Sequence, residues 1–266
     1  MAGHSHWASI RHKKGVVDAR RGKLFSKLAK HITVAARNGG GNPADNLRLR
    51  YAIDDAKAES MPKDSIERAI KKGTGELEGA ALEELVYEGI GPGGVSIMLD
   101  LLTDNRNRTS SEIRSIFEHR GGNLGKTGSV SWKFERKGIL VFPCRLIGEE
   151  RLYEAAIEAG AENIAVEEDQ YIVTSKPADF DAARGVLQNL LEGLRPKPDK
   201  KKGEEEGGSV FTRAELGRIP INTIMVDPAK APALLDLLNE LEEHDDVQHV
   251  YCDFELPEEA VKGSGP

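Results

Sequence analysis

Hydrophobic positions in the first quarter of the chain recur with the three- and four-residue spacing of α-helices. Between Arg20 and Arg37, apolar side chains lie on one side of a helical projection, and five lysines and arginines occupy an arc of about 100° on the other. Two further helices are expected, at 44–60 and at 64–72, the second ended by Gly73. The pattern therefore predicts a small helical domain over residues 1–78.

After residue 79 the pattern changes to the alternation that is typical of β-strands. Strand signals surround a GPGG turn at 91–94. The spacing of Thr109 and Glu112 predicts the start of a helix, and the segment SVSWKF at 129–134 is then expected as a strand. The next block has the order βαββαβ, with strands at 138–143, 163–168, 170–175 and 210–216 and helices at 149–159 and 179–194.

The last hydrophobic segments form one more βαβ piece, with strands at 220–226 and 247–256 around a helix at 231–243. Because this piece has too few elements for a core of its own, we expect it to complete the sheet that begins near residue 80. The predicted fold class is α+β, with a helical N-terminal domain and two ferredoxin-like α/β domains, the third inserted in the second. The expected divisions are 1–78, 79–136 with 218–257, 137–217 with a disordered loop near 196–209, and a tail at 258–266.

Composition narrows the class of protein. Hydrophobic residues make up 39% of the 266 residues and charged residues 30%, as in soluble globular proteins. No apolar run reaches the roughly 18 residues that cross a membrane. No signal or transit peptide is indicated, so we expect a cytoplasmic protein without a membrane partner. Cys144 and Cys252 are far apart and have no CxxC pattern, which favours reduced thiols, and we expect no metal and no cofactor.

Positive charge is concentrated near the N-terminus. Residues 1–75 contain 16 Lys/Arg and 7 Asp/Glu, a net charge of +9, whereas the rest of the chain contains 21 and 37, a net charge of −16. Exposed helices commonly alternate glutamate with lysine, yet the segment from Arg20 to Arg37 contains no carboxylate. A solvated helical face is the alternative interpretation. The unpaired cations favour a polyanion, and five phosphate contacts predict that log affinity falls with log salt at a slope of about −4 to −5.

Two other segments are candidates for phosphate contacts. The basic segment before the first helix has too few apolar residues to pack, and its Trp7 either stacks on a base or fills a groove in its own domain. In the loop DNRNRT, Arg106 and Arg108 lie at the start of a helix, where free amides attract anions, unless the arginines are merely solvated. The candidate nucleic-acid-binding residues are Arg11, Lys13, Lys14, Arg20, Arg21, Lys23, Lys27, Lys30, Arg37, Arg48, Arg50, Lys71, Lys72, Arg106 and Arg108.

The sequence contains no constellation that is typical of an enzyme. GGNLGKTG at 121–128 matches the end of a phosphate-binding loop. However, Arg120 stands where the motif needs its first glycine, and the loop runs from helix to strand instead of strand to helix. No nucleophile and base pattern is present, and we expect neither catalysis nor a small-molecule substrate. Two acidic pairs are interpreted as surface charge: Glu83 with Glu84, and Asp245 with Asp246.

Several long motifs resemble the YebC/PmpR family. They are MAGHSHWASIRHKK, DARRGKLFSKLAKHITVAARNGGGNP, LRLRYAIDDAKAESMPKDSIERAIKKGTGEL, YEGIGPGGVSIMLDLLTDNRNRT, GGNLGKTGSVSWKFERKG and VQHVYCDFE. The resemblance implies one helical and two α/β domains, the third inserted in the second. It also implies a bacterial DNA-binding transcriptional regulator, or a ribosome-linked factor in the translation of proline-rich sequences, similar to the family's mitochondrial translational activator of cytochrome oxidase subunit I. GVVDARR and KPDKKKGEEEGG depart from the family pattern.

Three functional hypotheses remain. The first, a nucleic-acid-binding regulatory protein acting as a DNA-binding transcriptional regulator, is the one we predict. The second is a ribosome-associated translation factor that binds ribosomal RNA, favoured because no segment carries a clear base-reading set of Asn, Gln and Arg. The third is a scaffold whose acidic domains bind basic proteins. The oligomeric state stays open.

Overall fold

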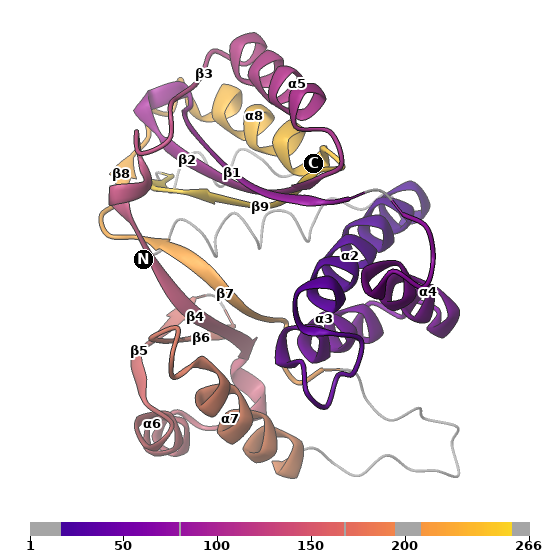
Figure 1. Ribbon diagram of the computed structural model, residues 1–266. Helices are drawn as coiled ribbons and strands as arrows, with labels where there is room; N and C mark the ends of the chain where they lie inside the picture. Colours follow the sequence, from indigo (N-terminus) through magenta and orange to yellow (C-terminus); the bar gives the residue numbers. More distant parts are fainter. Residues whose placement is uncertain (1–16, 80, 168, 195–208, 257–266) are drawn as a thin grey trace.

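The structure is a computed structural model that describes residues 17–79, 81–167, 169–194 and 209–256. These residues form three main hydrophobic cores, one among helices and one on each of two four-stranded sheets (Figure 1). The α+β class is confirmed.

The helical core is built by three helices, which are α2 (Val17–Gly39), α3 (Leu47–Ala58) and α4 (Lys63–Thr74). The side chain of Asn46 caps α3 by accepting a hydrogen bond from the Leu49 amide. Gly73 does not end α4 as predicted. It is buried within the helix, where a Cβ atom would lie 2.4 Å from the Thr33 carbonyl oxygen, and the left-handed residue that ends the helix is Gly75 (φ 83°).

The first sheet has the order β3-β1-β2-β9, with all neighbours antiparallel. Helices α5 and α8 cover one face of it and share its core (Figure 1). A short parallel pair, β8 and β10, lies beside it. The bounds are β1 Glu83–Ile90, β2 Ser96–Thr103, α5 Arg106–His119, β3 Asn123–Leu124, β8 Ile224–Met225, α8 Ala231–Glu243, β9 Val247–Cys252 and β10 Phe254–Glu255.

The second sheet has the order β5-β6-β4-β7, again antiparallel, with a βαββαβ chain path that is ferredoxin-like. Its bounds are β4 Phe134–Pro143, α6 Glu149–Glu158, β5 Ala161–Glu167, β6 Gln170–Ser175, α7 Phe180–Leu194 and β7 Arg213–Pro220. The chain leaves the first sheet through β4 and returns through its neighbour β7, so this unit is an insertion. The residue boundaries of the domains stay a prediction.

Several strand predictions are wrong in detail. The strand expected at 210–216 runs over Arg213–Pro220, and the strand expected at 247–256 is divided into β9 and β10. Residues 131–133 form a 3-10 turn, and the strand begins only at Phe134. The expected strand at 220–226 shrinks to β8, because its first residue belongs to β7 of the second sheet. The loop near 196–209 lies outside the described residues except for its last position.

Candidate nucleic-acid interface

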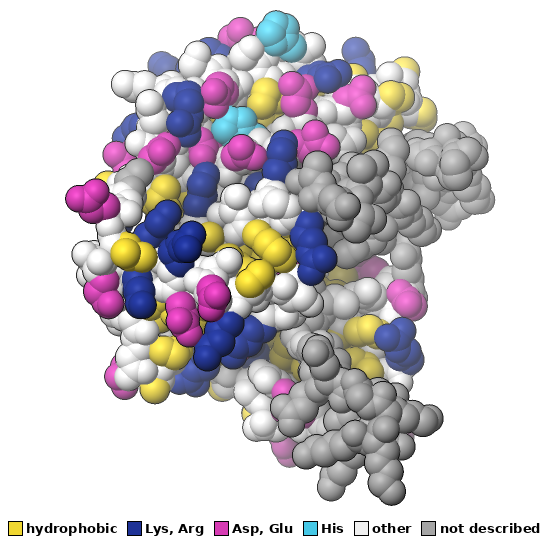
Figure 2. All heavy atoms as spheres, turned by 90° about the vertical axis from the view of Figure 1, so that its right-hand side faces the viewer, with side chains coloured by type: hydrophobic (Ala, Val, Ile, Leu, Met, Phe, Trp, Pro, Cys, Tyr) yellow, Lys and Arg dark blue, Asp and Glu magenta, His cyan; other side chains and the backbone are white. Residues whose placement is uncertain are grey.

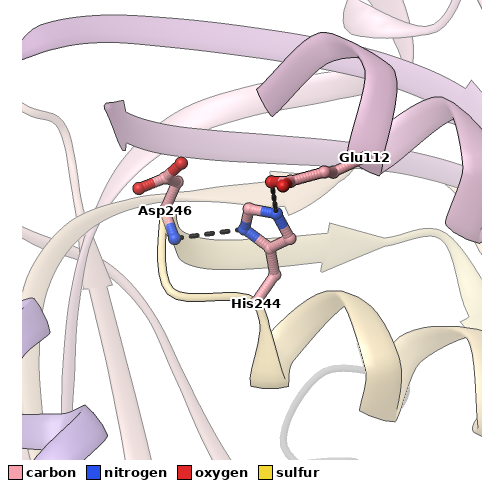
Figure 3. Close-up of side chains that lie close together, drawn as sticks. All are labelled: Glu112, His244 and Asp246. Carbon is pink, nitrogen blue, oxygen red and sulfur yellow. Dashed lines mark hydrogen bonds and ion pairs between the residues drawn. The ribbon is translucent and has the colours of Figure 1, made fainter. Parts of the chain in front are cut away.

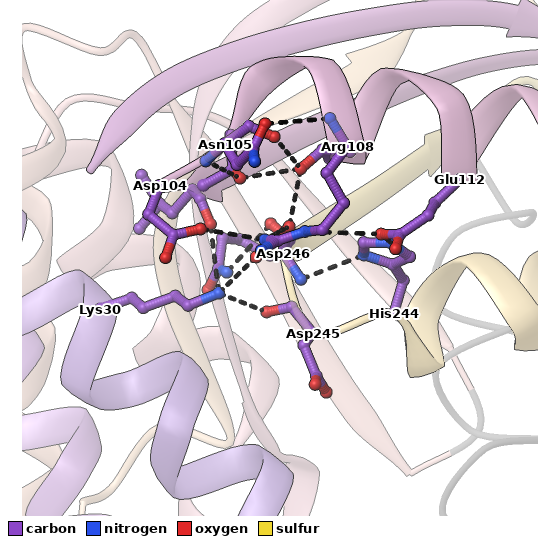
Figure 4. Close-up of polar contacts among 12 residues, drawn as sticks. Lys30, Asp104, Asn105, Arg108, Glu112, His244, Asp245 and Asp246 are labelled. Carbon is purple, nitrogen blue, oxygen red and sulfur yellow. Dashed lines mark hydrogen bonds and ion pairs between the residues drawn. The ribbon is translucent and has the colours of Figure 1, made fainter. Parts of the chain in front are cut away.

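Three of the predicted phosphate-binding lysines on α2 lie against the C-terminal end of α8. Lys23 Nζ donates to the Glu243 carbonyl at 3.1 Å, and Lys27 Nζ donates to the Glu242 carbonyl at 2.6 Å. Lys30 Nζ lies 2.6 Å from Asp246 Oδ1 and 3.0 Å from the Asp245 carbonyl (Figure 4). The expectation that these cations have no partner within the chain is therefore wrong.

The cause is the unusual end of α8. The last carbonyls of a helix lack intrahelical donors and carry the negative end of its dipole, which lysine or arginine in the last turn commonly stabilises. The last turn of α8 has no basic residue, and the chain there reads ELEEHDD over 240–246. Lysines from α2 supply the missing positive charge, although Lys27 and Glu242 are 215 residues apart in the sequence.

Asp246 is the centre of this contact. Its side chain is 4% exposed and accepts hydrogen bonds from Lys30, from Arg108 Nη2 at 2.9 Å and from Thr109 Oγ1 at 2.7 Å. Burial acts to raise its pKa, but the hydrogen bonds from these three partners outweigh burial and hold the pKa well below its usual range. Asp245 is exposed, as predicted, whereas the interpretation of Asp246 as surface charge is wrong.

The DNRNRT loop begins α5 differently from the prediction. Asn105, not Thr109, is the N-cap, and its side chain accepts from the Arg108 amide. Thr109 is buried inside the first turn and contacts Thr103 at 2.8 Å. Arg108 forms ion pairs with Asp104 and Asp246, so its charge is compensated by carboxylates of the same domain. Arg106 is exposed.

Glu112, His244 and Asp246 bring one ligand atom each within 4.8 Å of one another, which suggests a metal site (Figure 3). The donor set does not fit a cation. Both oxygens of Asp246 already accept from side chains, two of them cationic. His244 Nδ1 accepts from the Asp246 amide, and its Nε2 lies 3.0 Å from Glu112 Oε2. The cluster is a hydrogen-bonded support for the end of α8.

Three predicted arginines are held by other groups of the chain. Arg48 forms two hydrogen bonds to Glu84 on β1, at 3.0 and 2.8 Å. Arg37 Nη1 donates to the Leu82 carbonyl at 3.3 Å. Arg50 donates to two backbone carbonyls in the loop before α3. These residues anchor the helical domain and its connections.

A cationic surface nevertheless remains on the helical domain. Lys71 and Lys72 of α4 are exposed and form no ion pair with the described residues, and Arg21 is exposed with its guanidinium 5.5 Å from the ring of Phe25. Figure 2 shows Lys and Arg side chains gathered across the middle of this side of the molecule. Arg68 of α4 is also exposed, and it was not among the candidate residues predicted from the sequence. Arg11, Lys13, Lys14, Trp7 and the side chain of Arg20 lie outside the described residues.

A second polar junction joins all three units. His31 of α2 lies 5.6 Å, ring to ring, from His249 of β9, and His249 Nδ1 lies 3.3 Å from Glu215 Oε2 of β7. Burial, followed by the nearby charges of His249 and Arg48, lowers the pKa of His31 to about 3. The His31 ring is therefore neutral at pH 7.

The carboxylate of Glu88 binds the end of the loop at 121–128 and the turn that follows it. Glu88 accepts from the amides of Gly128, Val130 and Ser131 at 2.7 to 2.9 Å. The amide of Gly128, at the end of this loop, is therefore already paired.

The described chain is thus an α+β protein in which a cationic helical domain is docked on an antiparallel sheet that carries an inserted ferredoxin-like unit. The chain belongs to the TACO1/YebC family. The family's N-terminal domain matches residues 5–76, and its second and third domains match residues 82–254.

Similar proteins cover nearly the whole chain. A probable transcriptional regulatory protein of Geobacter sulfurreducens is 49% identical over 98% of this chain and 99% of its own length. One of Dictyoglomus turgidum is 45% identical with the same coverage. The crystal structure of a conserved hypothetical protein from Aquifex aeolicus is 48% identical, with a TM-score of 0.82, and covers 95% of this chain and 98% of that one. Among the described helices, none has the length and apolar character needed to cross a bilayer.

Proposed function

We propose that this chain is a non-enzymatic, nucleic-acid-binding regulatory protein, and that it acts on DNA as a transcriptional regulator. The observation that carries the proposal is the charge distribution, with +9 in the first 75 residues and −16 in the rest. The exposed cations of α4 and Arg21 offer phosphate contacts, while the acidic sheet domains are repelled by the same polyanion and so orient the complex. The names of the relatives, probable transcriptional regulatory proteins, support a regulatory role.

The test is fluorescence anisotropy with a labelled 20-base-pair DNA duplex and a labelled 20-nucleotide RNA between about 50 and 300 mM salt. We expect the double variant Lys71→Glu/Lys72→Glu to weaken binding about tenfold and to reduce the salt slope by about 2, one for each lost phosphate contact. Lys126→Glu/Lys176→Glu is the matched control, because it changes the same total charge at exposed positions outside the helical domain. Binding that does not weaken with salt, or an equal loss in both variants, would overturn the proposal.

The ribosome-associated alternative requires a separate measurement, because phosphate contacts carry no base information. Co-sedimentation with ribosomes in a cell extract, lost in Lys71→Glu/Lys72→Glu and retained in the control, would favour a translation factor that binds RNA. Co-sedimentation retained in both variants would favour a scaffold that acts through its acidic domains. No ribosome association, together with salt-dependent DNA binding, is the result that we expect.

A further inference from the structure

The contact between α2 and the end of α8 has the chemistry of a phosphate-binding surface. Lys23, Lys27 and Lys30, which we call the α2 lysine row, follow at intervals of four and three residues and therefore lie on one side of the helix. Their partners on α8 and just after it are the backbone carbonyl oxygens of Glu242, Glu243 and Asp245 and the carboxylate of Asp246. All four are anionic or partly negative oxygens, so each occupies a position that a phosphate oxygen of a nucleic acid would take on an open row.

We propose that the α2 lysine row is a covered phosphate-binding surface, and that the nucleic-acid backbone and the acidic end of α8 compete for it. The inference rests on the proposed function and extends it. In the closed arrangement seen here, the exposed cations of α4 make the first contacts. Binding of further phosphates then requires the helical domain to separate from the end of α8.

Separation of the helical domain from the end of α8 does not leave the buried Asp246 carboxylate without a partner. When Lys30 leaves, Asp246 keeps its hydrogen bonds from Arg108 and Thr109, both within the sheet domain. The lysines in turn exchange carbonyl partners for phosphates, and a charged pair of this kind is at least as strong. Asp246 and the lysines therefore keep charged partners in the open state, and the carbonyls at the end of α8 become accessible to water.

Opening also breaks other contacts of the helical domain, among them the exposed Arg48–Glu84 pair and the hydrogen bond that Tyr51 Oη donates to Asp181 Oδ1 at 2.7 Å. Only the segment between α4 and β1 connects the helical domain covalently to the first sheet. Against α7, Arg184 lies 3.7 Å from the Tyr51 ring and 3.6 Å from Asp54, yet within the described residues its Nε and Nη1 atoms are buried without a hydrogen-bond partner. The Arg184 guanidinium is thus incompletely satisfied in the closed arrangement, which lowers the cost of breaking its part of the contact.

The experiment compares two neighbouring substitutions that remove the same charge. Asp246→Asn breaks the ion pair to Lys30, whereas Asp245→Asn leaves the row covered, because the Asp245 side chain is exposed and only its carbonyl contacts Lys30. With the same DNA and RNA probes, we expect Asp246→Asn to bind about tenfold more tightly with a salt slope steeper by about 2 to 3, and Asp245→Asn to change affinity less than twofold. Adding Lys23→Gln/Lys27→Gln/Lys30→Gln should abolish the gain of Asp246→Asn.

Hydrogen exchange on the wild-type protein provides a test that does not depend on the variants folding. Saturating duplex should slow exchange in α2 and speed it in residues 242–247. Equal affinities of Asp246→Asn and Asp245→Asn, or protection of both segments by duplex, would overturn the covered row while leaving the proposed function intact. Failure of every variant to bind either probe would overturn both.

Discussion

Two ion pairs that join the helical domain to the first sheet, Lys30 with Asp246 and Arg48 with Glu84, should differ in strength because they differ in burial. Lys30 and Asp246 meet at 2.6 Å with side chains 22% and 4% exposed, whereas Arg48 and Glu84 meet at 2.8 Å with side chains 51% and 48% exposed. Hydrogen bonds to charged groups contribute about 1.5 to 3 kcal/mol, and the loss of one partner of a buried pair costs about 3 to 5 kcal/mol. Because Arg108 still compensates Asp246, we expect a Lys30–Asp246 coupling energy of about 2 kcal/mol. The exposed pair should give less than about 1 kcal/mol.

The assay is a pair of double-mutant cycles, Lys30→Met with Asp246→Asn and Arg48→Gln with Glu84→Gln. The free energy of unfolding is measured in urea by far-UV circular dichroism at pH 7. Raising salt from 0.1 to 0.5 M should remove most of the Arg48–Glu84 coupling and little of the other, since buried pairs are screened less. Equal coupling energies, or a Lys30–Asp246 coupling below about 0.5 kcal/mol, would refute the reasoning from burial.

Two further results are expected from the packing and protonation of the helical domain. The pKa of His31 is lowered to about 3 in the folded protein. As the pH falls below about 6.5, the His31 ring therefore becomes protonated in the unfolded chain but stays neutral in the folded protein. Stability relative to His31→Gln should therefore fall by up to about 1.4 kcal/mol per pH unit between about pH 6 and pH 4, and a constant difference in urea unfolding across that range would contradict the buried neutral ring. Gly73→Ala should cost about 2 kcal/mol or more, because its Cβ would lie 2.4 Å from the Thr33 carbonyl oxygen. The control Gly185→Ala, which meets nothing within 4 Å on the exposed face of α7, should stabilise by about 0.5 to 1 kcal/mol, so the two melting temperatures should move in opposite directions.

The helices and most strands could be predicted because their signals are local. The periodicity of α2 and the βαββα order of the inserted unit each come from residues within one turn or one pleat of each other. Errors occurred where long-range pairing decided the local structure. Pro220 joins β7 because Phe134 of β4 pairs with it. Thr109 lies inside the first turn of α5, where its hydroxyl donates to the distant Asp246, and Asn105 is the N-cap.

In the candidate site, too, the local features could be predicted from the sequence and the long-range contacts could not. The sequence alone determined that cations are concentrated in the helical domain and that a row of them lies on one side of α2. It did not reveal that this row faces the end of α8, because the partners are more than 200 residues apart and are brought together only when the chain returns from the inserted sheet. Helical periodicity is fixed by neighbouring residues, whereas the partner of a charged face is fixed by the packing of whole domains. That packing decided which lysines are covered and which remain exposed to a ligand.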